Sequence, residues 1–285
     1  MTALSKPRRD IDRALARCGM TPRSTVLISP LGERKGMRFA FRVELDDGRR
    51  VKARHFGSDA AARRVFALHA GLEPAFARVV AHEGAVLIEE WIEGTLLSPL
   101  QAETWTEEAG ALLGRLHRTP LGANVRPTSS TRAWRAAAES DLTLIASTGQ
   151  LSAGAVASLR TEIARGDPRV ARVALVHQDF CAENMLIDGQ GRLRIIDNEQ
   201  VDIAPVGFDL GRTFHRWPMA AETWGRFLRA YRSAAAAAPE ALGFWKIVAS
   251  LVTTRVFLQR LPARVDASLG LLRRLAERPN LGDPA

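Results

Sequence analysis

Apolar and polar residues alternate along much of the first third of the chain, which is the pattern of half-buried strands. Residues 37–45 (MRFAFRVEL) are apolar at every second position, and this period predicts a strand with one buried face. Asp47-Gly48 is a favoured hairpin turn, so residues 51–56 are expected to return as the next strand. The pattern therefore predicts an antiparallel hairpin near the start of the chain.

Further elements surround this hairpin in the sequence. Residues 1–22 are expected to form a leading helix. Ser58 can cap a helix over residues 59–70, and the segments 76–81 and 85–90 have the composition of two strands joined by a turn. Together these elements predict a small antiparallel sheet lobe.

Beyond Gly94 the apolar positions follow the period of a helix. Ser98 and Gln101 form a capping box with a proline at the first helical position. Further helices are expected at residues 109–116, 132–147, 153–165, 221–237 and 240 to the end, and short strands at residues 174–177, 185–188 and 193–197. The sequence thus predicts an α+β fold, with a sheet lobe over residues 1–94 and a larger helical lobe over residues 95–285.

The composition is that of a soluble globular protein. Apolar residues make up 46% of the chain and charged residues 25%. No stretch approaches the roughly 20 apolar residues that span a bilayer, and the first residues lack the apolar core of a signal peptide. The two cysteines, Cys18 and Cys181, form neither a metal-binding spacing nor a disulfide framework. A cytoplasmic protein without a membrane partner is therefore expected.

The net charge of +9 comes from 36 arginines and only 4 lysines. A nucleic-acid-binding module would explain such a charge, but the chain has no dense basic run and no interleaving of basic and aromatic residues. Nucleic acid is therefore disfavoured as a partner. A basic field also favours anionic ligands such as nucleotide phosphates over strongly cationic substrates.

One segment, LVHQDFCAENMLIDGQGRLRIIDNE, carries the candidate chemistry. Asp179 stands two residues after His177, Asn184 follows five residues later, and Asp197 follows thirteen residues after Asn184, at the end of an apolar run. Random placement would give the His-x-Asp-x-x-x-x-Asn spacing about 0.004 times in a chain of this composition. The spacing equals that of the protein-kinase catalytic loop and its later metal-binding aspartate.

Phosphoryl transfer requires these residue types. A hydroxyl nucleophile needs a carboxylate that orients it and accepts its proton, which is the role expected of Asp179. Mg²⁺ prefers hard oxygen ligands, and Asn184 and Asp197 offer an amide oxygen and a carboxylate. His177 is expected to hold the loop through hydrogen bonds. The pattern predicts an ATP- and Mg²⁺-dependent transfer to a hydroxyl group.

Four segments have the form of motifs that occur together in one family. They are His177-Gln178-Asp179, the run Ile195-Ile196-Asp197-Asn198-Glu199, the run Gly207-Phe208-Asp209-Leu210, and the helical segment Leu113-Gly114-Arg115-Leu116-His117. The chain thus resembles the aminoglycoside phosphotransferase and choline kinase superfamily, over roughly residues 25–260. The resemblance implies a protein-kinase-like two-lobe fold, and it implies that Asp209 supports the catalytic loop structurally.

The resemblance also implies that the sheet lobe binds ATP. Gly32 and Gly36 bracket a candidate phosphate loop, although a plain hairpin turn would have the same pattern. Lys52 is the candidate for pairing the α- and β-phosphates, and Arg54 is the competitor because it fits the same Val-Ala-Ile-Lys frame.

The segment 86–94 resembles the family's hinge, so backbone groups near Glu90 and Ile92 are expected to reach the adenine edge. The chain departs from the kinase pattern at the next element. Kinases pair their phosphate-binding lysine with a helix glutamate, but the helix expected at residues 59–70 contains none. This departure leaves a nucleotide-binding pseudokinase open as an alternative.

The acceptor implied by the resemblance is a small molecule with a hydroxyl group: an amino alcohol, a sugar or an aminoglycoside-like compound. Trp217, with Trp224 and Trp245, could offer aromatic faces to a quaternary ammonium group, or could pack in the core. Glu199 and Asp202 could bind a polycation, but the basic chain disfavours a dedicated aminoglycoside enzyme. The fold does not choose among these acceptors.

Overall fold

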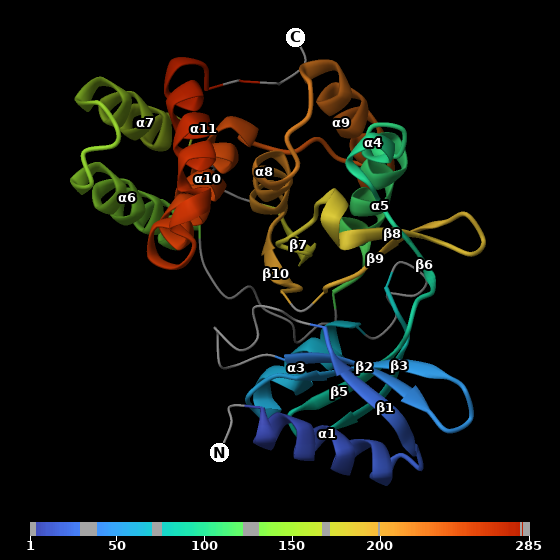
Figure 1. Ribbon diagram of the computed structural model, residues 1–285. Helices are drawn as coiled ribbons and strands as arrows, with labels where there is room; N and C mark the ends of the chain where they lie inside the picture. Colours follow the sequence, from blue (N-terminus) through green and yellow to red (C-terminus); the bar gives the residue numbers. More distant parts are fainter. Residues whose placement is uncertain are drawn as a thin grey trace. The chain divides into compact units, whose positions relative to one another are not determined.

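A computed structural model describes most of the chain as two compact units (Figure 1). The described residues are 4–28, 39–69, 76–121, 131–166, 172–198, 200–279 and 281. Unit 1 consists of Met1–Thr95 and Leu186–Glu199, and unit 2 consists of Leu96–Met185 and Gln200–Ala285.

Unit 1 is built on a five-stranded antiparallel sheet. Its strands are β1 (Pro22–Leu27), β2 (Phe39–Leu45), β3 (Arg50–His55), β4 (Val79–Glu83) and β5 (Val86–Glu90), in the order β1-β2-β3-β5-β4. The alternation expected in β2 is present, because every second side chain from Phe39 to Leu45 is buried. The turn between β2 and β3 contains Gly48, whose φ of 83° favours glycine. Met37, the expected first residue of β2, lies outside the described residues.

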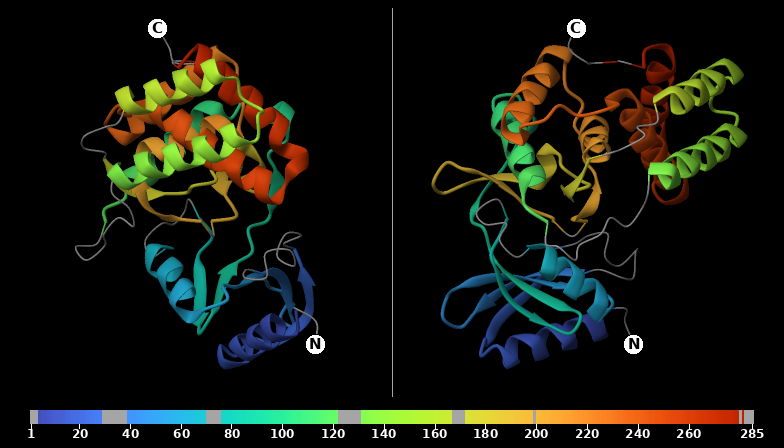
Figure 2. Two further views of the ribbon diagram at one scale, coloured as in Figure 1. Left: turned by 90° about the vertical axis from the view of Figure 1, so that its left-hand side faces the viewer. Right: turned by 180° about the vertical axis from the view of Figure 1, so that it is seen from behind.

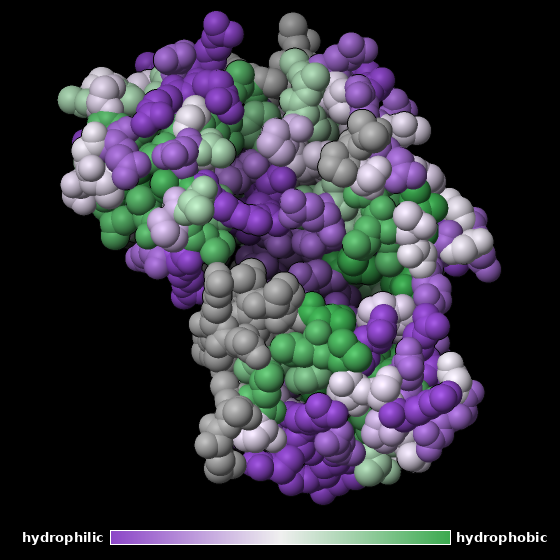
Figure 3. Space-filling model, in the orientation of Figure 1, coloured by the Kyte–Doolittle hydropathy of each residue, from purple (hydrophilic) through white to green (hydrophobic). Residues whose placement is uncertain are grey.

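Two helices cover opposite faces of this sheet (Figure 2). Helix α1 (Ser5–Arg17) packs apolar residues such as Ile11 and Leu15 against Val51 and Ala53 of β3, and its outward face is hydrophilic (Figure 3). Helix α3 (Asp59–His69) packs against Leu87 of β5 on the other face. Because side chains alternate along a strand, Lys52 and Arg54 lie on the α3 side of the sheet.

A second, three-stranded sheet lies in unit 1 except for its end residues Leu96 and Met185. It consists of β6 (Gly94–Leu96), β8 (Met185–Asp188) and β9 (Leu193–Ile195), in the order β6-β8-β9. Gly94 is required where β6 meets β8, because a Cβ atom there would lie 2.3 Å from the carbonyl oxygen of Ile187. The hairpin of β8 and β9 ends just before Asp197, so it carries that residue into unit 1.

Unit 2 is mainly helical, and helix α10 runs through its core. The helices are α4 (Pro99–Ala102), α5 (Thr106–Arg118), α6 (Thr131–Ser147), α7 (Ala153–Gly166), α8 (Val206–Arg216), α9 (Ala221–Ala235), α10 (Leu242–Arg260) and α11 (Val265–Glu277), with short 3₁₀ turns η1 (Ala182–Asn184) and η2 (Pro262–Arg264). Helix α10 is buried on nearly all sides by α6, α7, α8 and α11 (Figure 1), which is the packing expected of a helix that is apolar all round.

Close backbone approach joins α5 to α9. Cβ atoms added at Gly110 and Gly114 of α5 would lie 2.3 and 2.7 Å from the carbonyl oxygens of Phe227 and Tyr231. Only glycine permits this distance between the helix axes. The approach brings Tyr231 beside His117 at the end of α5.

The mixed fold predicted from the sequence is confirmed, but several elements differ from the prediction. The single helix expected from residue 240 to the end is wrong: α10 ends at Arg260, and Pro262 opens the turn η2 before α11. A proline inside a helix lacks one hydrogen bond and clashes with the preceding turn. The strand expected at residues 76–81 begins later, because β4 spans Val79–Glu83. Strands β1 and β10 and helix α8 were not predicted.

Among the helices in the described ranges, none has both the length and the apolar character that crossing a membrane requires.

Candidate active site

The first part of the segment with the kinase-like spacing, from His177 to Asn184, forms a loop in unit 2, whereas Asp197 belongs to unit 1. Strand β7 (Val173–Val176) leads into this loop, and β10 (Asp202–Pro205) pairs antiparallel with β7. Helix α8 begins directly after β10 and beside the start of β7, where the backbone N–H of Val206 donates to the carbonyl oxygen of Arg172 at 3.0 Å. From there it packs along β7. This arrangement brings Asp209 of α8 against the loop that starts at His177.

Asp209 holds the loop through its carboxylate. Its oxygens accept hydrogen bonds from the backbone N–H groups of His177 at 2.7 Å and Gln178 at 2.8 Å, and the ring of His117 lies 3.1 Å away. Burial alone would raise the pKa of Asp209, but the hydrogen bond to His117 and the nearby imidazoles keep it below its ordinary value. Gln178 has a φ of 63°, a conformation that persists only where its surroundings impose it.

His177 shapes the loop from inside. Its ring is fully buried, and Nδ1 accepts a hydrogen bond from the backbone N–H of Asp179 at 3.3 Å. The ring also packs edge-on against Phe180. These contacts orient the backbone on both sides of Gln178, and the Asp179 side chain that follows is 14% exposed.

The Asp179 carboxylate meets Asn184 on one side. The amide nitrogen of Asn184 donates to the backbone oxygen of Asp179 at 2.8 Å and to its Oδ2 atom at 3.2 Å. Both hydrogen bonds use the nitrogen, so the Oδ1 atom of Asn184 takes no part in them. No described residue donates a hydrogen bond to this oxygen. This oxygen is the kind of ligand that Mg²⁺ prefers.

Two arginines of α8 meet the other side of Asp179, and neither was singled out from the sequence. Arg212 and Arg216 lie one helical turn apart, so they share a face of α8. The Nη2 atom of Arg212 and the Nε atom of Arg216 lie 3.2 and 3.1 Å from Oδ1 of Asp179. The sequence contained one signal for them, which is that they follow Asp209 by three and seven residues.

Cys181 lies next to this cluster and is buried. Burial, and secondly the charge of Asp179, raise the pKa of its thiol. A buried cysteine with a raised pKa is a small apolar side chain and not a nucleophile.

In unit 1, Arg54 forms a buried ion pair that the sequence did not reveal. Its Nη2 atom donates to Oε1 of Glu89 at 2.6 Å, and the two side chains are only 2% and 1% exposed. Burial alone would raise the pKa of Glu89, but the charge of Arg54 lowers it to about 2. Lys52, the residue favoured from the sequence, is half-buried on the same face of β3 and interacts more weakly with Glu89.

A histidine extends this buried pair toward Asp197. Nδ1 of His69 lies 3.5 Å from Oε1 of Glu89 and 3.5 Å from the side-chain nitrogen of Asn198. Burial lowers the pKa of His69, so its ring is neutral near pH 7. Asp197 precedes Asn198 directly and is half-buried with a φ of 58°. Residues Arg54, Glu89, His69 and Asn198 therefore form one buried polar cluster beside Asp197.

The other expected site residues that the structure describes lie on β5, just after it, and on β10. Glu90 is exposed and pairs with Arg78, while Ile92 is half-buried. Asp202 is half-buried on β10, and its Oδ1 accepts a hydrogen bond from the backbone of Ile203. Gly32, Gly36 and Glu199 lie outside the described residues.

The tryptophans considered as a site for a quaternary ammonium group belong to the core of unit 2. Trp224 and Trp245 are fully buried, and Trp217 is nearly so. Trp217 packs edge-on against Phe227. Their aromatic faces are covered by protein, as the core-packing alternative expects.

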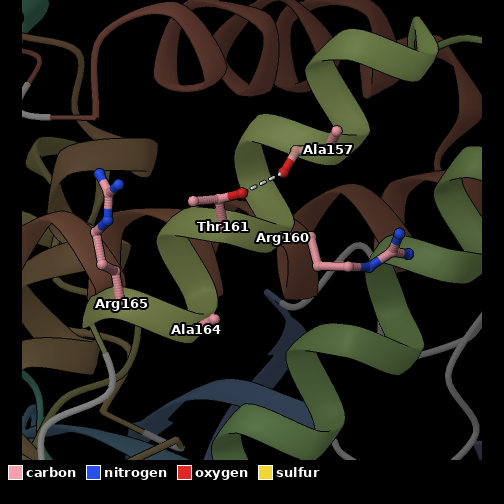
Figure 4. Close-up of a pocket in the computed structure, with 5 residues that line it drawn as sticks. All are labelled: Ala157, Arg160, Thr161, Ala164 and Arg165. Atoms are coloured by element: carbon pink, nitrogen blue, oxygen red, sulfur yellow. Dashed lines mark hydrogen bonds between the residues drawn. The ribbon is translucent and has the colours of Figure 1, made fainter.

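A surface depression on unit 2 is lined by residues of α7 alone (Figure 4). They are Ala157, Arg160, Thr161, Ala164 and Arg165. The depression includes neither Asp179 nor Asn184, and the hydroxyl of Thr161 donates to the backbone of its own helix. It therefore contributes no group to the candidate chemistry.

Residues 34–245 match the model of the phosphotransferase enzyme family. The chain belongs to this family. Membership confirms the resemblance inferred from the motifs, and it confirms the expectation of a small-molecule kinase. No curated protein matches the sequence significantly.

Several solved structures share the fold over nearly the whole chain. A choline/ethanolamine kinase family protein from Mesorhizobium loti is 21% identical, with 98% of this chain and 96% of that chain covered and a TM-score of 0.67. Choline kinase LicA from Streptococcus pneumoniae is 14% identical, with 96% and 99% covered and a TM-score of 0.69. LicA has also been solved in complex with AMP, at 14% identity, 96% and 98% coverage and a TM-score of 0.64.

The fold extends to phosphotransferases with other acceptors. A macrolide 2'-phosphotransferase from Brachybacterium faecium is 13% identical, with 92% of this chain and 96% of that chain covered and a TM-score of 0.65. At these identities the likeness establishes the fold. The kinase-like fold class predicted from the sequence is thereby confirmed.

Proposed function

We propose that this phosphotransferase transfers the γ-phosphate of ATP to a hydroxyl group of a small molecule, with Asp179 as the base and Mg²⁺ as the cofactor. The observation that carries the proposal is the loop from His177 to Asn184. Asp209 and His177 hold its backbone, and Asn184 hydrogen-bonds the Asp179 carboxylate. A cytoplasmic location, where ATP is available, belongs to the same proposal.

Asp179 has the free capacity that a base needs. A carboxylate offers about four acceptor positions. Both arginines approach Oδ1, while Oδ2 accepts only the hydrogen bond from Asn184 among the described residues. An acceptor hydroxyl can therefore donate to Oδ2, which would orient it and later receive its proton.

Asn184 and Asp197 are the proposed ligands of Mg²⁺. Asn184 offers its amide oxygen, and Asp197 offers a carboxylate that is half-buried at the end of β9. Mg²⁺ needs few protein ligands because it keeps several waters and binds substrate phosphates. When bound, the ion neutralises the charge on the phosphates of ATP.

Arg54 fits the role of the phosphate-binding cation better than Lys52. Glu89 holds one nitrogen of its guanidinium, while Nε and Nη1 are buried and have no hydrogen-bond partner among the described residues. Buried donors without partners are costly, and phosphate oxygens would satisfy both of them. In this proposal Glu89 of β5 replaces the helix glutamate of other kinases, which weakens the case for a pseudokinase.

ATP consumption by the full chain tests the proposal. We expect the wild-type protein, with Mg²⁺ and a panel of small alcohols, to release ADP in a way that depends on the acceptor. Asp179→Ala should lower kcat by at least about 100-fold, since general bases contribute that much or more. Asp266→Ala, which removes an exposed carboxylate from α11, is the matched control and should leave kcat unchanged.

The same protein separates this function from its alternative. Activity that survives Asp179→Ala would overturn the assignment of the base. A pseudokinase would be stabilised against thermal unfolding by Mg²⁺ and ATP, by mass action, yet would turn over no acceptor of the panel.

A further inference from the structure

The two arginines beside Asp179 differ in how completely the protein satisfies them. Each nitrogen of Arg212 donates a hydrogen bond: Nε to the backbone oxygen of Gln178 at 3.0 Å, Nη1 to the hydroxyl of Thr253 at 2.6 Å, and Nη2 to Asp179 at 3.2 Å. A structural role therefore explains these contacts of Arg212. This arginine ties α8 and α10 to the catalytic loop and orients the carboxylate of Asp179.

Arg216 has no comparable set of partners. Its Nε atom lies 3.1 Å from Oδ1 of Asp179, but not in the direction of a hydrogen bond, so this buried N–H group lacks an acceptor. Its Nη2 atom reaches Sγ of Cys181 at 3.8 Å and Glu183 at 3.2 Å. No described residue accepts a hydrogen bond from Nη1. Of the guanidinium nitrogens, Nε is therefore buried without an acceptor, Nη2 is paired, and Nη1 has no partner among the described residues but is not buried.

The carboxylates of unit 2 that contact this loop do not neutralise Arg216. Glu183 is 74% exposed, and an ion pair with so exposed a partner contributes little. Asp209 directs its oxygens to two backbone N–H groups and to His117. Asp179 is shared with Arg212. The side chain of Arg216 is only 18% exposed, and the buried N–H of Nε without an acceptor is a cost. Nη1 is the donor that a bound anion can reach.

We propose that Arg216 determines acceptor specificity by binding an anionic group, a carboxylate or a phosphate, on the molecule whose hydroxyl is phosphorylated. The proposal rests on the proposed function. A planar guanidinium matches the oxygens of such groups in a bidentate arrangement. With the hydroxyl on Oδ2 of Asp179 and the anion on Arg216, the acceptor is held at two points, which orients it for transfer.

This specificity differs from that named for several structural neighbours. A quaternary ammonium or a protonated amine placed at Asp179 would meet two guanidinium groups at contact distance, and the tryptophans that could have received it are buried. The chain as a whole is also basic, with a net charge of +9. An acidic alcohol is the class of acceptor that this environment favours.

An oxyanion at Arg216 could have a second source, the phosphoryl group that is transferred from ATP. The two sources make different predictions. If Arg216 binds the acceptor, its loss affects anionic acceptors selectively. If Arg216 binds the transferred group, its loss affects every acceptor to the same extent.

The test compares alcohols that share a carbon skeleton and differ in charge. Glycerate and glycerol 3-phosphate are anionic, glycerol is neutral, and 3-aminopropane-1,2-diol is cationic; sets of four to six carbons with the same charges extend the panel. The value of kcat/KM for each is measured with the wild-type chain, Arg216→Gln and Arg216→Lys. Arg229→Gln, which removes an exposed arginine from α9, is the matched control, and Asp179→Ala gives the background.

We expect the wild-type enzyme to prefer anionic alcohols over neutral and cationic ones by at least about tenfold, the size of one charged hydrogen bond. Arg216→Gln should remove most of this preference through KM, Arg216→Lys should retain part of it, and Arg229→Gln should leave it intact. A wild-type preference for neutral or cationic alcohols would overturn the proposal while leaving the proposed function in place. An equal loss on all acceptors in Arg216→Gln would also overturn it. No Asp179-dependent turnover with any acceptor would defeat both.

Discussion

At the scale of single residues, the charged groups of the candidate site in unit 1 are more deeply buried than those in unit 2. In unit 1, Arg54 and Glu89 are buried together, and a carboxylate with a pKa of about 2 stays ionised at every physiological pH. In unit 2, Asp179 and its two arginines are mostly but not fully buried, with side chains that are 14%, 13% and 18% exposed. A buried ion pair is weak evidence for stability, because desolvation can exceed the attraction. The pair is better explained by a ligand that uses the remaining donors of Arg54.

Removing the charge of Glu89 tests this explanation. Glu89→Gln leaves Arg54 without its counter-charge, so we expect the KM for ATP to rise at least about tenfold and the free energy of unfolding to fall by about 3–5 kcal/mol. Steady-state kinetics and urea unfolding measure the two effects. Glu89→Asp keeps the negative charge, so its KM for ATP should lie between the values of Glu89→Gln and the wild type.

A second comparison keeps the prediction testable if Glu89→Gln folds poorly. Lys52→Ala changes a half-buried side chain and should raise the KM for ATP less than Arg54→Lys does. The reverse order would return the phosphate-binding role to Lys52, the residue favoured from the sequence.

The residues that sequence reasoning missed share a physical reason. Glu89 stands in the apolar run VLIEE, where a carboxylate suggests the exposed end of a strand. Its partner is 35 residues away on the neighbouring strand, and only the strand register brings the two together. Arg212 and Arg216 follow a recognised motif, but their helix was not predicted. The residues of the loop from His177 to Asn184 could be predicted from the sequence because they lie close together along the chain.

At the scale of elements, the sequence predicted those strands and helices whose buried faces follow a regular period. Strand β2 and the apolar face of α5 were evident because their alternation is regular. Strand β1 was not predicted, and none of its six side chains is fully buried. Strand β10 spans only Asp202–Pro205 and ends in a proline. Three of the four residues of β10 are buried, but four residues are too few to establish a period. A strand without a buried face, such as β1, gives an equally weak pattern, so neither could be distinguished from a loop.

The contact between α5 and α9 can be tested at Gly114. Alanine usually stabilises a helix relative to glycine by up to about 1 kcal/mol. At Gly114, however, a Cβ atom would lie 2.7 Å from the carbonyl oxygen of Tyr231 and 2.8 Å from Ala234. We expect Gly114→Ala to lower the free energy of unfolding by about 1–3 kcal/mol through overpacking.

The control for this prediction is Gly154→Ala in α7, where no atom of the described residues lies within 4 Å of the added atom. That variant should be neutral or slightly stabilising in the same urea unfolding experiment. If Gly114→Ala were as stable as the wild type, α9 would be able to shift and make room for the added methyl group at little cost in free energy. The tight approach would then not be needed to bring Tyr231 to His117.

At the scale of the whole molecule, the charge of +9 has to be reconciled with a small-molecule function. Exposed arginines in both units have carboxylate partners, among them Arg50 with Glu93, Arg115 with Glu108 and Arg160 with Glu139. A nucleic-acid-binding surface instead concentrates unpaired basic groups on one face. The dispersal of these pairs argues against a continuous basic surface for a phosphate backbone. The positive charge fits the ligands proposed above, ATP and an acidic acceptor.

This argument predicts weak binding to nucleic acid. With fluorescently labelled duplex DNA and RNA, we expect any association at 50 mM salt to disappear by 200 mM. The slope of the logarithm of the association constant against the logarithm of salt should stay shallower than about −3, because a protein that makes Z phosphate contacts gives a slope of about −0.9Z on duplex DNA. Tight binding with a slope of −6 or steeper would instead indicate a continuous basic surface. Adding ATP with Mg²⁺ would then show whether that surface and the proposed nucleotide site are the same, since ligands of one site displace each other.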